Sequence, residues 1–165
     1  MVSAIVFSLP PAYPAVLGVA VSTVFLNIWQ NFLVGSARRA SGIKYPQIYA
    51  EQAELAAEAE AVSAPEKRVK YIFNCTQRAH QNTLESLPGF LTVLAVASTR
   101  HARVAAWLGG LFVVGRAVYT VGYIQGDPRK RMPGSILSLI PMLGLLGTAT
   151  TAVYQLANTH GLGLF

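Results

Sequence analysis

Charged residues are confined to the middle of this 165-residue chain. No Lys, Arg, Asp or Glu precedes Arg38 and none follows Arg131, so residues 1–37 and 132–165 are two long uncharged stretches. A helix needs about 20 mostly apolar residues to span a bilayer, and each stretch is longer than that. The composition agrees, because 53% hydrophobic and 12% charged residues make the chain more apolar than a typical soluble domain. The sequence therefore predicts an integral membrane protein.

Four membrane-spanning helices can be placed, which predicts an all-α four-helix bundle in a single domain over residues 1–165. The predicted helices cover residues 13–36, 73–98, 104–123 and 134–157. Residues 37–72 then form a long connection, and its Ala/Glu-rich part is either a solvated helix or a flexible loop. A soluble bundle is the alternative fold, but the helix lengths match a bilayer.

Basic residues are divided unevenly among the connections. Nine lie in the first and third connections, whereas the second holds only Arg100 and Arg103. Because cytosolic loops carry an excess of Lys and Arg, we expect the first and third connections in the cytosol and both termini in the lumen. The first apolar run lacks a preceding basic region, so a cleaved signal peptide is not expected.

Polar side chains interrupt the second predicted helix in the sequence RAHQNTLESLP, residues 78–88. Hydrogen-bonding and ionisable groups are costly in a membrane unless they have partners, and they are candidates for function by default. On a helix Arg78, Asn82 and Glu85 lie at positions i, i+4 and i+7, which places them along one face. The alternative interpretation is that Arg78 and Glu85 only neutralise buried charge.

The third predicted helix carries a second polar strip, formed by Arg116, Tyr119 and Tyr123. Both strips lie near the cytosolic ends of their helices, so one pocket could enclose a polar ligand. Such a ligand should carry several anionic groups, an ammonium and amide dipoles. Glutathione fits, because its carboxylates suit Arg and its amino group suits Glu85. An anionic phospholipid headgroup is the main competitor.

Metal and disulfide chemistry are not expected. Three scattered His residues and one Cys show no zinc-ligand spacing, and a single cysteine excludes an internal disulfide. We interpret Cys75 as a small buried hydrophobic residue, with a reactive thiol as the alternative.

Three motifs carry a resemblance to a known family. Residues 73–88, FNCTQRAHQNTLESLP, resemble the third type of microsomal glutathione transferase in the MAPEG superfamily (membrane-associated proteins in eicosanoid and glutathione metabolism). Residues 115–131, which continue after Gly115 as RAVYTVGYIQGDPRKR, resemble the same type. SARRA, residues 36–40, is similar to the motif that follows the first helix of leukotriene C synthase, a member of the same superfamily. The resemblance covers residues 13–157. It implies a homotrimer in the endoplasmic reticulum or nuclear envelope, with glutathione bound between neighbouring subunits near the cytosolic side.

The resemblance also implies roles for the residues of the two polar strips. Arg78, Asn82 and Glu85 would hold the γ-glutamyl end of glutathione, with Glu85 taking the ammonium. Tyr119 and Tyr123 match tyrosines that line the same site.

Four further residues receive roles from the resemblance. Arg38 and His80 would lie near the glycine carboxylate, and Arg39 and Arg131 near the sulfur. The stretch after Tyr123 is one residue longer here than in leukotriene C synthase, so the rivals of Arg131 are Arg129 and Lys130.

The function implied is a glutathione transferase with glutathione peroxidase activity in lipid metabolism. A free thiol has a pKa near ~8.5, so a fixed guanidinium is expected to favour the reactive thiolate. The thiolate would then attack a hydrophobic electrophile or a lipid hydroperoxide. The alternatives are a non-catalytic lipid-binding scaffold of the same superfamily and a purely structural membrane protein.

Overall fold

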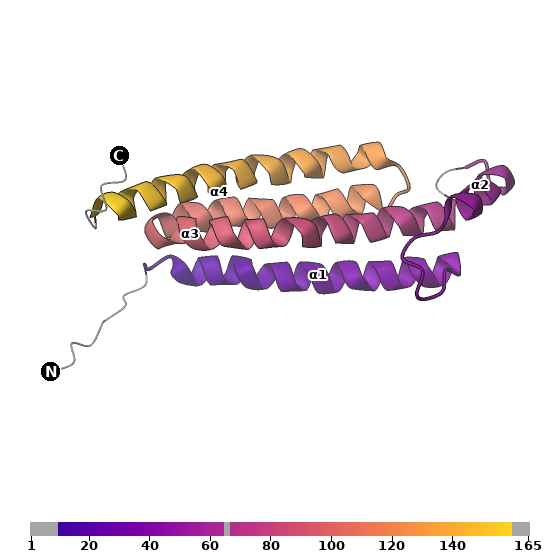
Figure 1. The fold of residues 1–165 in the computed structure, drawn as a ribbon, viewed down its shortest axis with the longest axis horizontal. Coiled ribbons are helices and arrows are strands. Elements are labelled where there is room, and N and C mark those ends of the chain that lie inside the picture. Colours follow the sequence, from indigo (N-terminus) through magenta and orange to yellow (C-terminus); the bar gives the residue numbers. More distant parts are fainter. Residues whose placement is uncertain (1–9, 65–66, 160–165) are drawn as a thin grey trace.

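The computed structural model describes residues 10–64 and 67–159, and this part of the chain contains helices and no strand. Five elements follow one another along the chain (Figure 1). They are α1 (Tyr13–Ser41), α2 (Gln52–Ala61), α3 (Val69–Tyr123), the 3-10 helix η2 (Pro128–Arg131) and α4 (Met132–Thr159). The predicted all-α class is confirmed.

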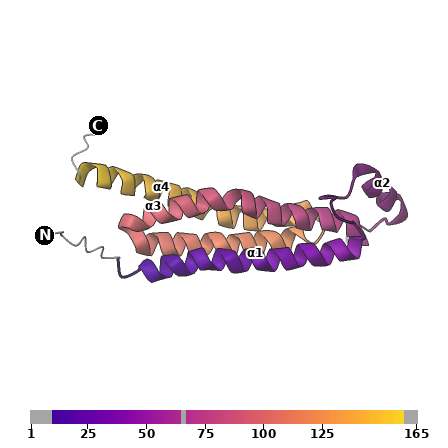
Figure 2. The same cartoon turned by 60° about the horizontal axis from the view of Figure 1, so that its bottom comes forward.

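Helix α3 folds back on itself at His101, whose backbone leaves the helical region with φ −126° and ψ 47°. We call residues 69–100 the first arm of α3 and residues 102–123 the second arm. The arms run antiparallel (Figures 1 and 2). Phe90 of the first arm stacks on Phe112 of the second, with ring centroids 4.0 Å apart. The second and third predicted helices are therefore joined by a single non-helical residue.

Three stretches are long and apolar enough to cross a membrane: α1, α3, and η2 together with α4. A straight helix of 55 residues would be about 80 Å long, whereas a bilayer core is about 30 Å thick. The fold at His101 divides α3 into two arms of spanning length. The chain is thus a multi-pass helical membrane protein.

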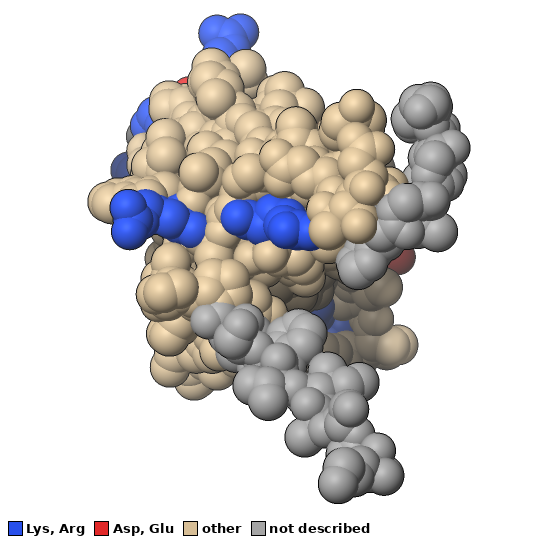
Figure 3. Space-filling model, turned by 90° about the vertical axis from the view of Figure 1, so that its left-hand side faces the viewer, with Lys and Arg blue, Asp and Glu red and all other residues tan. Residues whose placement is uncertain are grey.

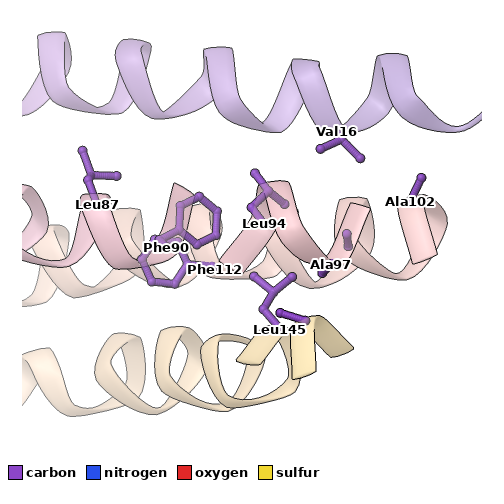
Figure 4. Close-up of a cluster of buried hydrophobic side chains, with 10 residues drawn as sticks. Val16, Leu87, Phe90, Leu94, Ala97, Ala102, Phe112 and Leu145 are labelled. Carbon is purple, nitrogen blue, oxygen red and sulfur yellow. The ribbon is translucent and has the colours of Figure 1, made fainter. Parts of the chain in front are cut away.

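The apolar core lies where α1 and α4 pack on the two arms of α3. Phe90, Leu94 and Leu145 are almost completely buried there, beside Phe112 and Val16 (Figure 4). Many large apolar side chains point outward instead. Such an apolar outer surface is what lipid-facing helices require.

Glycines bring the second arm of α3 and α4 into close backbone contact. A Cβ at Gly115 would lie 2.6 Å from the Ser138 nitrogen, and one at Gly134 would meet the backbone of Tyr119. Small residues let helix backbones approach closely in membranes. This contact seats Tyr119 directly against the start of α4.

The long first connection contains the short helix α2, which has no buried residue. The Glu58 carboxylate accepts hydrogen bonds from the backbone N–H groups of Lys70 (2.9 Å) and Tyr71 (3.1 Å). These are free donors in the first turn of α3, so Glu58 caps that helix. Of the two interpretations of the Ala/Glu-rich stretch, a solvated helix is the one observed.

The two ends of the bundle differ in charge. The start of α1, the turn of α3 and the end of α4 share one end, and α2 and η2 lie at the other (Figure 1). Figure 3 looks onto the first end and shows blue surface in only a few places. The second end holds Arg38, Arg39 and the basic run of η2.

Candidate functional site

The polar strip of the first arm is exposed. Arg78 Nη1 lies 2.9 Å from Glu85 Oε1, and the two side chains are 43% and 49% exposed. An exposed ion pair contributes little to stability. Within one chain the pair therefore neutralises no buried charge, and both groups are open to a ligand.

Arg116 joins the two arms of α3 beside this strip. The residue is 5% exposed, and its Nη2 donates to Asn82 Oδ1 over 2.9 Å and to Thr83 Oγ1 over 2.8 Å. It also lies 4.3 Å from the centre of the Tyr119 ring. Its Nη1 makes no hydrogen bond to any described residue, so donors remain for a ligand.

The end of the second arm presents two tyrosines to Arg131. The rings of Tyr119 and Tyr123 meet edge to face, with centroids 5.6 Å apart. Arg131 Nη1 donates to Tyr123 Oη over 3.3 Å, and its guanidinium carbon lies 4.9 Å from that ring. Arg129 and Lys130 are exposed, and Lys130 Nζ donates to Gln125. Among the three basic residues of η2, Arg131 is the one whose guanidinium contacts Tyr123.

Four of these residues line a cavity of about 410 Å³ between α3 and α4, which we call the α4 groove. Its polar end holds Asn82, Arg116, Tyr119 and Arg131, and its lining continues to the apolar side chain of Met142. Sequence reasoning missed part of this lining, namely Ser86, Phe112, Met132, Ser135, Ser138, Leu139 and Met142. One continuous surface thus passes from guanidinium groups to apolar side chains.

Arg38 lies elsewhere, at the end of α1. It is largely buried, and its Nη1 donates to the carbonyl oxygens of Gln47 (2.7 Å) and Ile43 (3.5 Å). Its guanidinium lies between the rings of Tyr45 and Phe73, at 4.3 and 4.7 Å from their centres. The segment after α1 therefore wraps around Arg38 and fixes its position.

A second cavity of about 260 Å³, the α1 groove, lies between α1 and the first arm of α3. Arg38 and His80 face it together, and Gln77 in its lining has a buried Oε1 without a donor among the described residues. Sequence reasoning did not select most of its lining, namely Asn31, Val34, Tyr45, Gln77, Gln81 and Leu84.

The two grooves lie on different faces of the first arm. Gln77, Gln81 and Leu84 line the α1 groove, whereas Asn82 and Ser86 line the α4 groove. At about 100° per residue these two sets are about 150° apart around the helix axis, with the exposed ion pair between them. A single chain therefore does not bring the candidate residues into one pocket.

Arg39 lines neither groove. It is exposed on α1, one residue after Arg38, and does not meet Arg131 within the chain. In the described part of the chain no three His, Cys, Asp or Glu side chains gather to hold a metal ion. Cys75 is buried against Ala79 and Tyr123, as expected of a packing residue.

The fold and the grooves define a class of protein: a multi-pass helical membrane protein with a cationic groove at one end of its bundle. The model of the MAPEG family matches residues 16–151. The chain belongs to the MAPEG family. The family named by the motif resemblance is therefore confirmed.

Two curated proteins illustrate the relationship. Mouse (Mus musculus) microsomal glutathione S-transferase 2 is 34% identical over 88 residues, which are 50% of this chain and 60% of the mouse protein. An uncharacterized protein from Synechocystis sp. is 38% identical over 85 residues, which are 51% of this chain and 62% of that protein. The chain spans about three fifths of the length of the curated relatives it matches. The mouse relative is of the second type, whereas the motifs resemble the third.

Proposed function

We propose that the chain is a membrane-bound glutathione transferase, which ionises the thiol of glutathione for attack on hydrophobic electrophiles. The observation that carries this proposal is the α4 groove, whose lining runs from Asn82, Arg116 and Arg131 to Met142. A water-soluble anionic co-substrate and an apolar substrate can meet along such a surface. Family membership and the similarity to a microsomal glutathione S-transferase support the same activity.

Glutathione would bind by its γ-glutamyl end at the strip of the first arm. The exposed Arg78 can pair with the carboxylate and the exposed Glu85 with the ammonium, exchanging their mutual ion pair for two pairs with the ligand. Asn82 and Arg116 offer N–H donors on one side of the strip, where the Tyr119 and Tyr123 rings lie. Each ligand charge then meets an opposite charge, which limits the desolvation cost.

A second copy of the chain would complete the site. Arg38 and His80 face the α1 groove. Within one chain, a ligand in the α4 groove therefore does not meet them. When the α1 groove of one subunit packs beside the α4 groove of the next, both sets face one ligand. In a closed symmetric assembly every such interface is the same, which supports the homotrimer that the family resemblance implies.

The sulfur would be ionised by Arg131, with Arg39 of a neighbouring subunit as the second cation. Arg131 sits at the rim of the α4 groove beside the Tyr123 hydroxyl. An Arg side chain cannot take up the thiol proton, but its positive charge favours the thiolate. Lowering the thiol pKa by roughly two units needs about 2.7 kcal/mol, which a partly desolvated guanidinium can supply.

The thiolate would then react in one of two ways. With an electrophile such as an epoxide, a C–S bond forms, the C–O bond breaks and the oxygen takes up a proton. With a lipid hydroperoxide, the sulfur attacks the terminal oxygen and the O–O bond breaks. This gives an alcohol and a sulfenic acid, which a second glutathione converts to the disulfide and water.

The proposal includes an endoplasmic reticulum or nuclear envelope membrane, with both termini in the lumen and the glutathione site near the cytosol. The gathering of Lys and Arg around α2 and η2 supports this orientation. Cysteine-reactive labelling of single cysteines placed in α2 and beside Arg100 checks it. Labelling in α2 by an impermeant reagent added to intact microsomes is the expected result.

Glutathione consumption by the purified protein in detergent tests the activity. We expect consumption with a chlorinated nitrobenzene and with a lipid hydroperoxide, and loss of both in Arg131→Ala. Arg100→Ala, at the other end of the bundle, is the matched control and should keep full activity. A lipid-binding scaffold would bind lipid without consuming glutathione, and that outcome would reject the enzyme.

A further inference from the structure

A buried polar network crosses the bundle behind the α4 groove. It consists of Gln30 on α1, Thr83 on the first arm of α3, and Arg116 and Thr120 on the second arm. Thr83 is completely buried, and Gln30 and Thr120 are each 1% exposed. Polar groups in an apolar core are stable only with partners, and here the partners come from three helical segments.

The direction of each hydrogen bond in this network is determined. The Thr83 hydroxyl donates to the Ala79 carbonyl (3.1 Å), and the Thr120 hydroxyl donates to the Arg116 carbonyl (2.9 Å). Each hydroxyl has one proton, so both can only accept from the network. Gln30 Nε2 therefore donates to Thr83 (2.9 Å) and to Thr120 (2.6 Å).

Arg116 extends this network to Asn82 as a hydrogen-bond donor. Its Nε and Nη2 donate to Thr83 Oγ1 at 3.2 and 2.8 Å, and Nη2 also donates to Asn82 Oδ1 at 2.9 Å. A guanidinium has no acceptor, so Asn82 must turn its amide oxygen toward Arg116. The amide N–H₂ of Asn82 is then left for the ligand in the α4 groove.

We propose that Thr83 and Gln30 are positioning residues, which hold Arg116 and through it make Asn82 a hydrogen-bond donor to glutathione. This inference rests on the proposed function. Asn82 in this orientation recognises a carboxylate or carbonyl oxygen of the tripeptide and not an N–H group. Without the Thr83 hydroxyl, Arg116 loses the acceptor that orients it, and the Asn82 amide can rotate.

Stability alone does not account for Gln30. Its Oε1 is buried and has no donor among the described residues, and a buried acceptor without a partner is destabilising. An apolar side chain of similar length, such as Met, would fill the same space without that cost. The two hydrogen bonds that Gln30 donates hold Thr83 and Thr120 in place, and this positioning explains the amide better than stability does.

Calorimetric titration of the full-length protein with glutathione in detergent tests the inference. Thr83→Val keeps the shape of the side chain and removes its oxygen, and we expect affinity to fall about tenfold, as for lost hydrogen bonds to a charged group. Thr83→Ser restores the hydroxyl and should restore most of the affinity. Thr23→Val is the matched control, because Thr23 is equally buried and donates only to the Ala20 carbonyl.

A double-mutant cycle separates positioning from general loosening. In an Asn82→Leu background, Thr83→Val should cause a clearly smaller loss of affinity than in the unmodified protein, because the part of its effect that passes through Asn82 is already absent. An undiminished loss there, or unchanged affinity in Thr83→Val alone, would overturn the inference and leave the proposed function standing. Failure of the unmodified protein to bind glutathione would reject both. If Thr83→Val does not fold, Gln30→Met replaces it, alone and combined with Asn82→Leu, in the same affinity measurements.

Discussion

Arg116 Nη2 and Asn82 Oδ1 lie 2.9 Å apart, so a hydrogen bond joins the two arms of α3 at the polar end of the α4 groove. The bond connects positions 34 residues apart in the chain, and it decides which atoms of Asn82 face a ligand. The α4 groove is therefore a surface of N–H donors and cations at this end. Such a surface selects an anionic co-substrate.

Asn82→Asp tests this description. The new carboxylate would pair with Arg116, so we expect the melting temperature to stay the same or rise. The groove would lose two N–H donors and gain a negative charge, so glutathione affinity should fall tenfold or more. Calorimetry and thermal unfolding measure the two effects. Unchanged affinity would show that the Asn82 amide donates nothing to the ligand.

Arg131→Ala should abolish thiolate formation and leave glutathione bound. The reason is that Arg131 contacts Tyr123, whereas the residues that we propose for the γ-glutamyl end lie on the first arm. The ultraviolet absorbance of the thiolate on adding glutathione reports ionisation, and calorimetry reports binding. A full thiolate signal in the variant would move the role to another cation, namely Arg39, Arg129 or Lys130.

Glu85→Gln removes a charge and keeps the size of the side chain. The ion pair that Glu85 forms with Arg78 is about half exposed, so the melting temperature should change little. Glutathione affinity should fall, because the ligand ammonium loses its carboxylate. An analogue of glutathione without the amino group should bind the variant and the unmodified protein equally. Weaker binding of that analogue to the variant would contradict the ammonium assignment.

The pKa of Glu54 is lowered from its usual value of 4.5, mainly by the hydrogen bond from the Glu51 backbone N–H and then by Gln47. A carboxyl with a lowered pKa stabilises the folded form above its usual pKa, and loses that contribution as pH falls through the folded value. Amide hydrogens of α2 should therefore exchange faster relative to the rest of the chain as pH falls below 4.5. Glu54→Gln should remove this pH dependence, and persistence in the variant would point to another carboxyl.

The helices could be predicted from the sequence because their signals are local. A charge-free stretch of spanning length predicts a membrane helix, and α1 and α4 contain the predicted ranges. The single-residue turn at His101 could not be predicted, since no Gly or Pro marks it. Helix α1 also continues to Ser41, past the predicted end, and stops at Gly42, whose left-handed backbone (φ 71°) caps it.

The sequence could name candidate residues for the site, but it could not predict how they are arranged. Spacing along a helix shows that Arg78, Asn82 and Glu85 share a face, but it does not show which helix covers the neighbouring faces. The pairing of Gln30 with Thr83 spans 53 residues and has no local signal. Gln30 lies in the uncharged N-terminal stretch with Asn27 and Asn31, so amides inside an apolar helix were the one available indication.

Mixed assemblies test whether two subunits build each site. Arg38→Ala damages the α1 groove and Asn82→Leu damages the α4 groove, so each variant alone should have little activity. When the two are co-expressed with different affinity tags and purified through both, some interfaces pair an intact α1 groove with an intact α4 groove. In a trimer that contains both variants, one of the three interfaces would do so, and activity should recover to about one third of the unmodified level. The double variant Arg38→Ala/Asn82→Leu mixed with itself is the control, because no interface in it is intact. If the tagged mixture stays as inactive as that control, each glutathione site is built within one chain.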